Sequence, residues 1–134
     1  MKNHTVLLAD DEVHITHILE RKFQKAGFSV VVAGDGEEAL EIARENPPDL
    51  VITDLQMPYM SGIELATHLR ELPGTADTPV IMLTARGYLV SEEQLSRTNI
   101  RQIVSKPFSA KRILDEAIAL IGSADASGLR EDAA

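Results

Sequence analysis

The feature that most constrains the fold is an alternation of short apolar runs with longer amphipathic segments. Short apolar runs are typical of buried strands, and apolar residues spaced at i, i+3, i+4 are typical of helices. The predicted strands cover residues 6–9, 28–33, 50–52, 79–83 and 100–104. The predicted helices cover residues 13–26, 37–46, 62–72, part of 91–98, and 109–121. This order predicts an α/β fold, a doubly wound parallel sheet of the (βα)5 type with helices on both faces.

Polar side chains follow the predicted strands at the end where such sheets bind ligands. Asp10 and Asp11 follow the first strand, Asp54 follows the third, Thr84 the fourth and Lys106 the fifth. Because ligands bind beyond the carboxyl ends of parallel strands, we expect three carboxylates, a hydroxyl and an amine to meet at one edge of the sheet.

A crowded group of carboxylates is costly unless a cation joins it. Two like charges about 4 Å apart repel by roughly 4 kcal/mol at an effective dielectric near 20. The chain has no cysteine, and oxygen ligands suit Mg²⁺ or Mn²⁺. Asp54 is then a candidate nucleophile, since carboxylates form aspartyl-phosphate intermediates. Lys106 supplies positive charge, and Thr84 can donate a hydrogen bond to a phosphoryl oxygen.

Each of these features taken alone has a purely structural explanation. An Asp-Asp pair after a strand is usually a turn or a helix cap, and Asp11 could cap the helix that begins near Val13. A threonine that ends a strand and a Lys-Pro pair are ordinarily structural. The arrival of all these side chains at one edge favours the functional interpretation.

Six motifs together resemble one known family. The motifs are Leu8-Ala9-Asp10-Asp11-Glu12, Ala33-Gly34-Asp35-Gly36-Glu37-Glu38-Ala39-Leu40, Asp49-Leu50-Val51-Ile52-Thr53-Asp54-Leu55-Gln56-Met57-Pro58, Ser61-Gly62, Pro79-Val80-Ile81-Met82-Leu83-Thr84-Ala85 and Lys106-Pro107-Phe108. From about Thr5 to Ile121 the chain is similar to the response-regulator receiver domains of two-component signalling, which include the bacterial chemotaxis response regulator.

The resemblance implies a flavodoxin-like fold with strand order 2-1-3-4-5 and a phosphorylation site. It implies that Asp54 is the phosphoacceptor and that Thr84 and Lys106 contact the phosphoryl group. It also implies a Mg²⁺ site, with Asp11, Asp54 and the backbone carbonyl of Gln56 as direct ligands and Asp10 acting through water. The phosphoryl group would come from a histidine kinase or a histidine phosphotransfer protein, and phosphorylation would switch the binding of a downstream protein.

One position departs from the family pattern. Members usually carry Tyr or Phe three residues before the lysine, where this chain has Ile103. In the usual switch of the family, that aromatic ring turns inward behind the threonine. Ile103 has no ring and cannot make this movement. We expect an intact phosphorylation site whose coupling to output differs, and Tyr88 is a candidate for part of the aromatic role.

Charge and composition narrow the class of partner. The net charge of −8 repels phosphate backbones and anionic lipid, so direct binding of nucleic acid or of a membrane is not expected. No apolar run is long enough to span a membrane, and we expect a cytoplasmic location. The predicted receiver domain covers residues 1–121, and residues 122–134 are expected to be a disordered tail or a truncated linker. A dimer that forms on phosphorylation is a further expectation.

Two other functions stay open at this point. A metal-dependent phosphatase or phosphotransferase that uses an aspartyl-phosphate commonly has a second Asp two residues after the nucleophile, where this chain has Gln56. A receiver-like module that only binds would not need the complete set of acidic, hydroxyl and amine side chains. We therefore expect a signalling receiver rather than an enzyme that turns over an external substrate.

Overall fold

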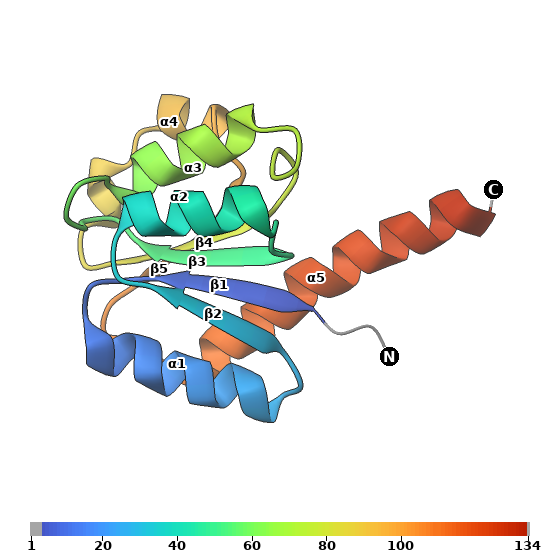
Figure 1. The fold of residues 1–134 in the computed structure, drawn as a ribbon, viewed down its shortest axis with the longest axis horizontal. Helices are drawn as coiled ribbons and strands as arrows, with labels where there is room; N and C mark the ends of the chain where they lie inside the picture. The colour runs from blue at the N-terminus through green and yellow to red at the C-terminus, as the bar shows by residue number, and fades with distance from the viewer. Residues whose placement is uncertain (1–3, 134) are drawn as a thin grey trace.

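The structure is a computed structural model that describes the backbone of residues 4–133 and the side chains of residues 4–122. Strands and helices alternate along the chain, with one 3-10 turn before α4 (Figure 1). The strands are β1 (Thr5–Ala9), β2 (Ser29–Ala33), β3 (Leu50–Asp54), β4 (Val80–Thr84) and β5 (Ile100–Ser105). The helices are α1 (Val13–Lys25), α2 (Gly36–Glu45), α3 (Gly62–Glu71), the 3-10 turn η1 (Gly87–Leu89), α4 (Glu92–Ser96) and α5 (Ala110–Ala133).

The five strands form one parallel sheet in the order β2-β1-β3-β4-β5. The strand order expected from the resemblance is therefore confirmed. In this order the carboxyl ends of β1 and β3 are neighbours at the centre of the sheet, and β4 and β5 follow on one side. This edge is where the predicted site residues were expected to meet.

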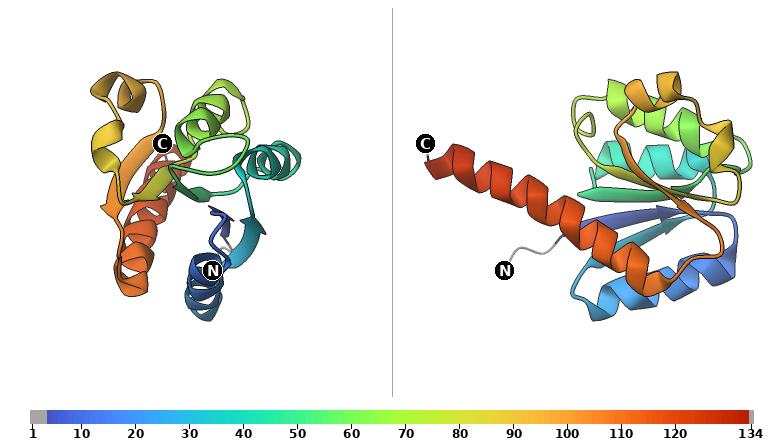
Figure 2. Two further views of the ribbon diagram at one scale, coloured as in Figure 1. Left: turned by 90° about the vertical axis from the view of Figure 1, so that its left-hand side faces the viewer. Right: turned by 180° about the vertical axis from the view of Figure 1, so that it is seen from behind.

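Helices cover both faces of the sheet, and each face has its own hydrophobic core. α1 and α5 lie on one face, and α2, α3 and α4 lie on the other (Figures 1 and 2). The central strands β3 and β4 are buried along their whole length, while the edge strands β2 and β5 consist mostly of exposed and half-buried residues. This is the pattern of a sheet whose centre is covered twice and whose edges meet solvent.

Helix ends follow local signals in the sequence, with one exception. The Asp35 side chain accepts a hydrogen bond from the Glu38 N–H at the start of α2, and Ser61 forms a capping box with Glu64 at the start of α3. Gly27, beyond α1, has the expected left-handed conformation with φ 98°. Asp11 does not cap α1, because the N-cap residue is Glu12 and its side chain makes no capping bond.

Helix α5 is longer than the sequence predicts. It runs to Ala133, whereas the sequence predicted a helix to residue 121 followed by disorder. Its last part projects beyond the sheet, away from the other elements (Figure 1). Residues 124–133 contain no proline and only one glycine, so nothing in the sequence interrupts a helix that has already begun. The division of the chain into a receiver domain and a tail stays a prediction.

Length alone does not make α5 a membrane span. Its sequence mixes apolar residues with charged ones throughout. Across the part of the chain that the structure describes, no helix is both long and apolar enough to cross a membrane.

A close backbone approach fixes the segment after β3. The Gly62 N–H donates a hydrogen bond to the Leu55 carbonyl at 2.8 Å, and a Cβ atom on Gly62 would lie 2.1 Å from the carbonyl oxygen of Asp54. No other residue can replace glycine here unless β3 or α3 moves. Gly62 therefore allows α3 to start directly against the end of β3.

We predict that Gly62→Ala lowers the free energy of unfolding by about 3 kcal/mol, the upper part of the usual range for overpacking, because the clash is with backbone. Urea denaturation would measure this change. Gly34→Ala is the control, since a Cβ atom there meets nothing within 4 Å, and it should change stability by less than about 0.5 kcal/mol. Equal stability of the two variants would contradict the prediction.

Candidate functional site

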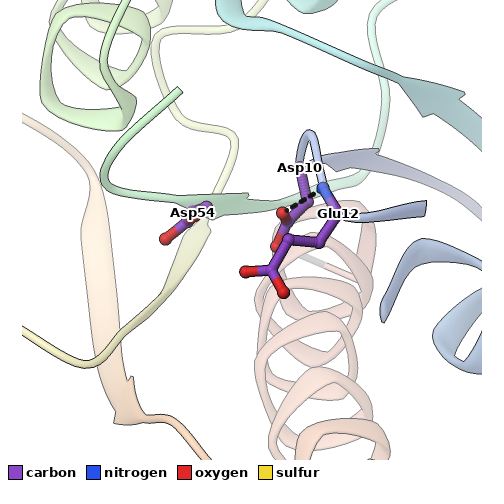
Figure 3. Close-up of side chains that lie close together, drawn as sticks. All are labelled: Asp10, Glu12 and Asp54. Atoms are coloured by element: carbon purple, nitrogen blue, oxygen red, sulfur yellow. Dashed lines mark hydrogen bonds between the residues drawn. The ribbon is translucent and has the colours of Figure 1, made fainter. Parts of the chain in front are cut away.

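Three carboxylates meet at the carboxyl ends of β1 and β3. Asp10 directly follows β1, Asp54 ends β3, and Glu12 is the N-cap residue of α1. One carboxylate oxygen from each lies within 4.8 Å of the others (Figure 3). Asp10 and Asp54 are buried, and the Glu12 side chain is 46% exposed, so the group opens to solvent on the Glu12 side.

The Lys106 ammonium contacts all three carboxylates. Its Nζ atom lies 3.2 Å from Asp10 Oδ2, 3.2 Å from Glu12 Oε1 and 3.4 Å from Asp54 Oδ2. Lys106 directly follows β5 and reaches this position across β4 and β3. One positive charge thus partly neutralises three negative ones.

Backbone amides hold the remaining oxygens of the two buried carboxylates. Asp10 Oδ1 accepts a hydrogen bond from the Glu12 N–H at 2.9 Å, which is the dashed line in Figure 3. Asp54 Oδ1 accepts one from the Leu55 N–H at 2.7 Å. In each residue, therefore, one oxygen is oriented by the backbone of the turn that follows the strand, and the other faces Lys106.

The environment shifts the pKa of two of these groups. Burial raises the pKa of the Asp10 carboxyl above its ordinary 3.8, and the Asp54 charge adds to this, while the Glu12 amide and Lys106 oppose it. Burial alone would lower the pKa of the Lys106 ammonium. The charges of Asp10 and Asp54, with hydrogen bonds to Glu12 and Asp10, outweigh burial and raise that pKa above 10.5. Lys106 is therefore a permanent cation at neutral pH.

Thr84 lies next to this group and is tied to Lys106 through the backbone. It ends β4 and is 3% exposed. The Lys106 N–H donates a hydrogen bond to the Thr84 carbonyl at 3.2 Å, and the Thr84 hydroxyl accepts one from the Arg86 N–H at 3.0 Å. The hydroxyl proton is thus left for another acceptor.

The predicted metal ligands fall into two places. Asp10 and Asp54 belong to the carboxylate group, whereas the Asp11 carboxylate does not, and Gln56 follows β3 two residues after Asp54. Asp11 and Gln56 are both exposed, and they line a neighbouring hollow of about 680 Å³ beside the loop that follows β3. The direct ligation by Asp11 and by the Gln56 carbonyl stays a prediction.

Ile103, at the position of the family aromatic, packs between the sheet and η1. It lies on β5 opposite Met82 of β4 and is half-buried. A Cβ atom on Gly87 would lie 3.0 Å from Ile103 Cγ2 and 3.9 Å from Thr84 Cγ2. Gly87 therefore lets the loop after β4 pack tightly against Ile103, whereas a Cβ atom would be at an ordinary van der Waals distance from Thr84. Tyr88, by contrast, is 81% exposed and does not fill the space behind Thr84.

Glu12 is the site residue that reasoning from the sequence missed. The sequence placed it inside a family motif but gave it no role. The available signal was its spacing, since Glu12 is the third acid in a row and stands two residues after Asp10. The turn into α1 brings its side chain back over the end of β1.

The group has the donor set and charge of a site for a divalent cation. Three carboxylates and one ammonium leave two negative charges, and all the donors are oxygens, which Mg²⁺ prefers. The residues present therefore fit the ion that the resemblance implies.

Comparison with known proteins identifies the family. The chain matches the family model of the response regulator receiver domain over residues 6–118. The chain belongs to this family. Receiver domains are signalling modules that accept phosphoryl groups from histidine kinases, so the function expected from the resemblance is confirmed at that level. The transcriptional regulatory protein SrrA of Staphylococcus aureus is 34% identical over 116 residues, which are 87% of this chain and 47% of SrrA.

Solved structures of receiver domains have the same fold. The chemotaxis response regulator CheY4 of Vibrio cholerae is similar with a TM-score of 0.81 and 28% identity, over 89% of this chain and 99% of that one. The receiver domain of the sensor histidine kinase PA1611 of Pseudomonas aeruginosa has a TM-score of 0.80 and 21% identity, over 90% and 99%. That structure holds a magnesium ion in its active site cleft, and at this identity the likeness to our chain concerns the fold alone.

We predict that Asp10→Asn raises the free energy of unfolding at pH 7, without divalent cations, by about 1 kcal/mol, the usual scale for relieving one unfavourable charge. The folded protein holds the Asp10 proton more tightly than the unfolded chain, because the pKa is raised. As pH rises from the unfolded value of 3.8 through the folded value, stability is lost, and it is not regained at neutral pH.

Urea denaturation at several pH values would measure the effect. Below both pKa values the variant and the wild type should converge, because Asp10 is then protonated in both states. Asp115→Asn, on the exposed face of α5, should stay within about 0.5 kcal/mol of wild type at each pH. A variant less stable than wild type at pH 7 would contradict the prediction.

Proposed function

We propose that this receiver domain accepts a phosphoryl group on Asp54 and that bound Mg²⁺ supports the transfer. The observation that carries the proposal is the position of the Asp54 carboxylate, buried at the end of β3 beside Asp10, Glu12 and Lys106. A buried aspartate with one oxygen fixed by the Leu55 amide offers its other oxygen in a defined direction.

The transfer forms one bond and breaks another. Asp54 Oδ2 forms a bond to phosphorus, and the bond from phosphorus to the donor atom breaks. The electron pair leaves with the donor, either an imidazole nitrogen of a histidine kinase or the acetate of acetyl phosphate. Mg²⁺, when bound, supplies positive charge that offsets repulsion between the anionic carboxylate and the anionic donor.

This chain's own residues orient the reactants and stabilise the charge. The Lys106 ammonium, which lies 3.4 Å from Asp54 Oδ2 before reaction, is placed to pair with a phosphoryl oxygen afterwards. The Thr84 hydroxyl donates to another phosphoryl oxygen. Both contacts exist only when a phosphoryl group is present, so both favour the phosphorylated state.

Magnesium is supported by the oxygen donors, by their charge, and by a relative. The oxygens of Asp10, Glu12 and Asp54 cluster in a group with two uncompensated negative charges. The receiver domain of PA1611, which has the same fold, holds magnesium in its own active site cleft. The expected direct ligands Asp11 and Gln56 border this place, and Mn²⁺ has the same preference for oxygen.

The hydrolase alternative is not favoured. In such enzymes a second aspartate two residues after the nucleophile acts as acid and base, whereas Gln56 has no exchangeable carboxyl proton. A module that only binds would have no reason to keep four charged groups at one buried edge. We therefore propose a phosphorylation-dependent switch that does not turn over an external substrate.

Partners beyond the phosphoryl donor belong to the proposal as well. The chain spans less than half the length of the curated relatives it matches, so their activities as whole proteins do not carry over. We propose that this chain is cytoplasmic and that a downstream protein binds one state of the switch better than the other. We expect no direct contact between this chain and nucleic acid or membrane. A dimer that forms on phosphorylation stays a prediction.

We predict that incubation with acetyl phosphate and Mg²⁺ adds one phosphoryl group, seen by intact mass, and that Asp54→Asn adds none. Asp77→Asn, at a fully exposed aspartate between α3 and β4, is the matched control and should react as wild type does. Phosphoryl uptake by Asp54→Asn, or none by wild type, would overturn the assignment of Asp54.

We predict that Ile103 limits how far the phosphorylation signal spreads. Backbone amide shifts should change near Asp54 and Thr84 when a phosphoryl mimic binds, and only weakly along β5, because Ile103 has no ring to turn inward. Comparing amide shifts of the free and mimic-bound protein would test this. A large response that runs from Thr84 through β5 as far as residue 104 would contradict altered coupling.

A further inference from the structure

Lys106 covers the two oxygens that the proposed function needs. Asp10 and Asp54 each have one oxygen bonded to a backbone amide, from Glu12 and Leu55 respectively. Their second oxygens are the ones that lie 3.2 Å and 3.4 Å from Lys106 Nζ. A divalent cation that binds these second oxygens must therefore compete with the ammonium of Lys106.

Glu12, the third carboxylate in contact with Lys106, is more exposed and less constrained than Asp10 and Asp54. Glu12 Oε1 lies 3.2 Å from Lys106 Nζ, as close as Asp10, but the Glu12 side chain is half exposed. No backbone amide among the described hydrogen bonds fixes its carboxylate, and its other oxygen lies 3.7 Å from His14 Nε2. Glu12 can thus keep its contact with Lys106 while the buried carboxylates change theirs.

We propose that Glu12 is a positioning residue that acts through Lys106. It retains the ammonium at the open side of the site when Mg²⁺ binds and the second oxygens of Asp10 and Asp54 lose their contacts with Lys106. Lys106 then stays within reach of a phosphoryl group on Asp54. This inference rests on the proposed function, because it concerns the same site.

Competition for the buried carboxylates favours this role over a bystander ion pair. Without Glu12 the only carboxylate partners left to Lys106, among the described residues, are Asp10 and Asp54, so the ammonium would compete with the incoming ion for both. Loss of an ordinary surface ion pair would not change this competition.

A double-mutant cycle separates action through Lys106 from direct ligation. Mg²⁺ affinity would be measured by calorimetry for wild type, Glu12→Gln, Lys106→Met and the double variant, with folding checked by urea denaturation. Glu12→Gln should weaken Mg²⁺ binding about fivefold to tenfold in the wild-type background and twofold or less without Lys106, the scale of coupling between contacting residues. Glu37→Gln, an exposed carboxylate at the start of α2 that does not contact Lys106, controls for the lost charge.

The outcomes distinguish this inference from the proposed function. An equal loss of affinity in both backgrounds would mean that Glu12 ligates the ion itself, and no loss in either would mean that it has no role; both overturn the inference. Phosphoryl uptake by the wild type is measured in parallel by intact mass. If the wild type takes up a phosphoryl group but the effect of Glu12→Gln on Mg²⁺ affinity does not depend on Lys106, only the positioning role is overturned. If that effect does depend on Lys106 but no phosphoryl group is taken up, only the phosphorylation of Asp54 is overturned. No Mg²⁺ binding by wild type would overturn both.

Discussion

The contact of one ammonium with three carboxylates is the interaction on which the site depends. Lys106 lies within 3.4 Å of an oxygen of each carboxylate, and the four residues come from three distant places in the chain: the turn between β1 and α1, the end of β3 and the position after β5. Without that positive charge, carboxylates this close together would repel strongly in a partly buried place. Even with Lys106 the group keeps two uncompensated negative charges, and this excess of negative charge is the basis of the proposed Mg²⁺ site.

The parallel sheet supplies the positions, and the turns after its strands supply the orientation. β1 and β3 are neighbours, so Asp10 and Asp54 are delivered side by side. The amides that directly follow them in the turns then bind one oxygen of each carboxylate. Gly62 lets α3 start against the carbonyl of Asp54, which fixes this turn further. Two aspartates at strand ends thereby become two oriented oxygens.

The sequence predicted most of the fold and only part of the site. Periodicity located every strand and helix because it records burial, and the edge of the sheet followed from the alternation of strands and helices. The strand order came from the family resemblance, since periodicity does not say which strands pair. Glu12 was missed because its contact with Lys106 spans 94 residues of sequence and depends on how α1 leaves β1. The length of α5 was missed because the sequence of residues 122–133, rich in small and charged residues, does not show the apolar spacing by which the other helices were found.

The same edge of the sheet links the phosphorylation site to the departure at Ile103. On one side, the Thr84 carbonyl accepts a hydrogen bond from the Lys106 N–H. On the other side, Thr84 lies near Gly87, which packs closely against Ile103. A movement of Thr84 toward a phosphoryl group would therefore change its contact with Gly87, the residue of η1 that packs tightly against Ile103. In the usual family switch, phosphorylation changes the orientation of an aromatic side chain on the fifth strand. Ile103 and Gly87 have no ring to reorient, so a conformational change at Thr84 can pass through them only as a displacement of the loop. In this chain, output is thus expected to be read from the loop after β4 rather than from the face of β5.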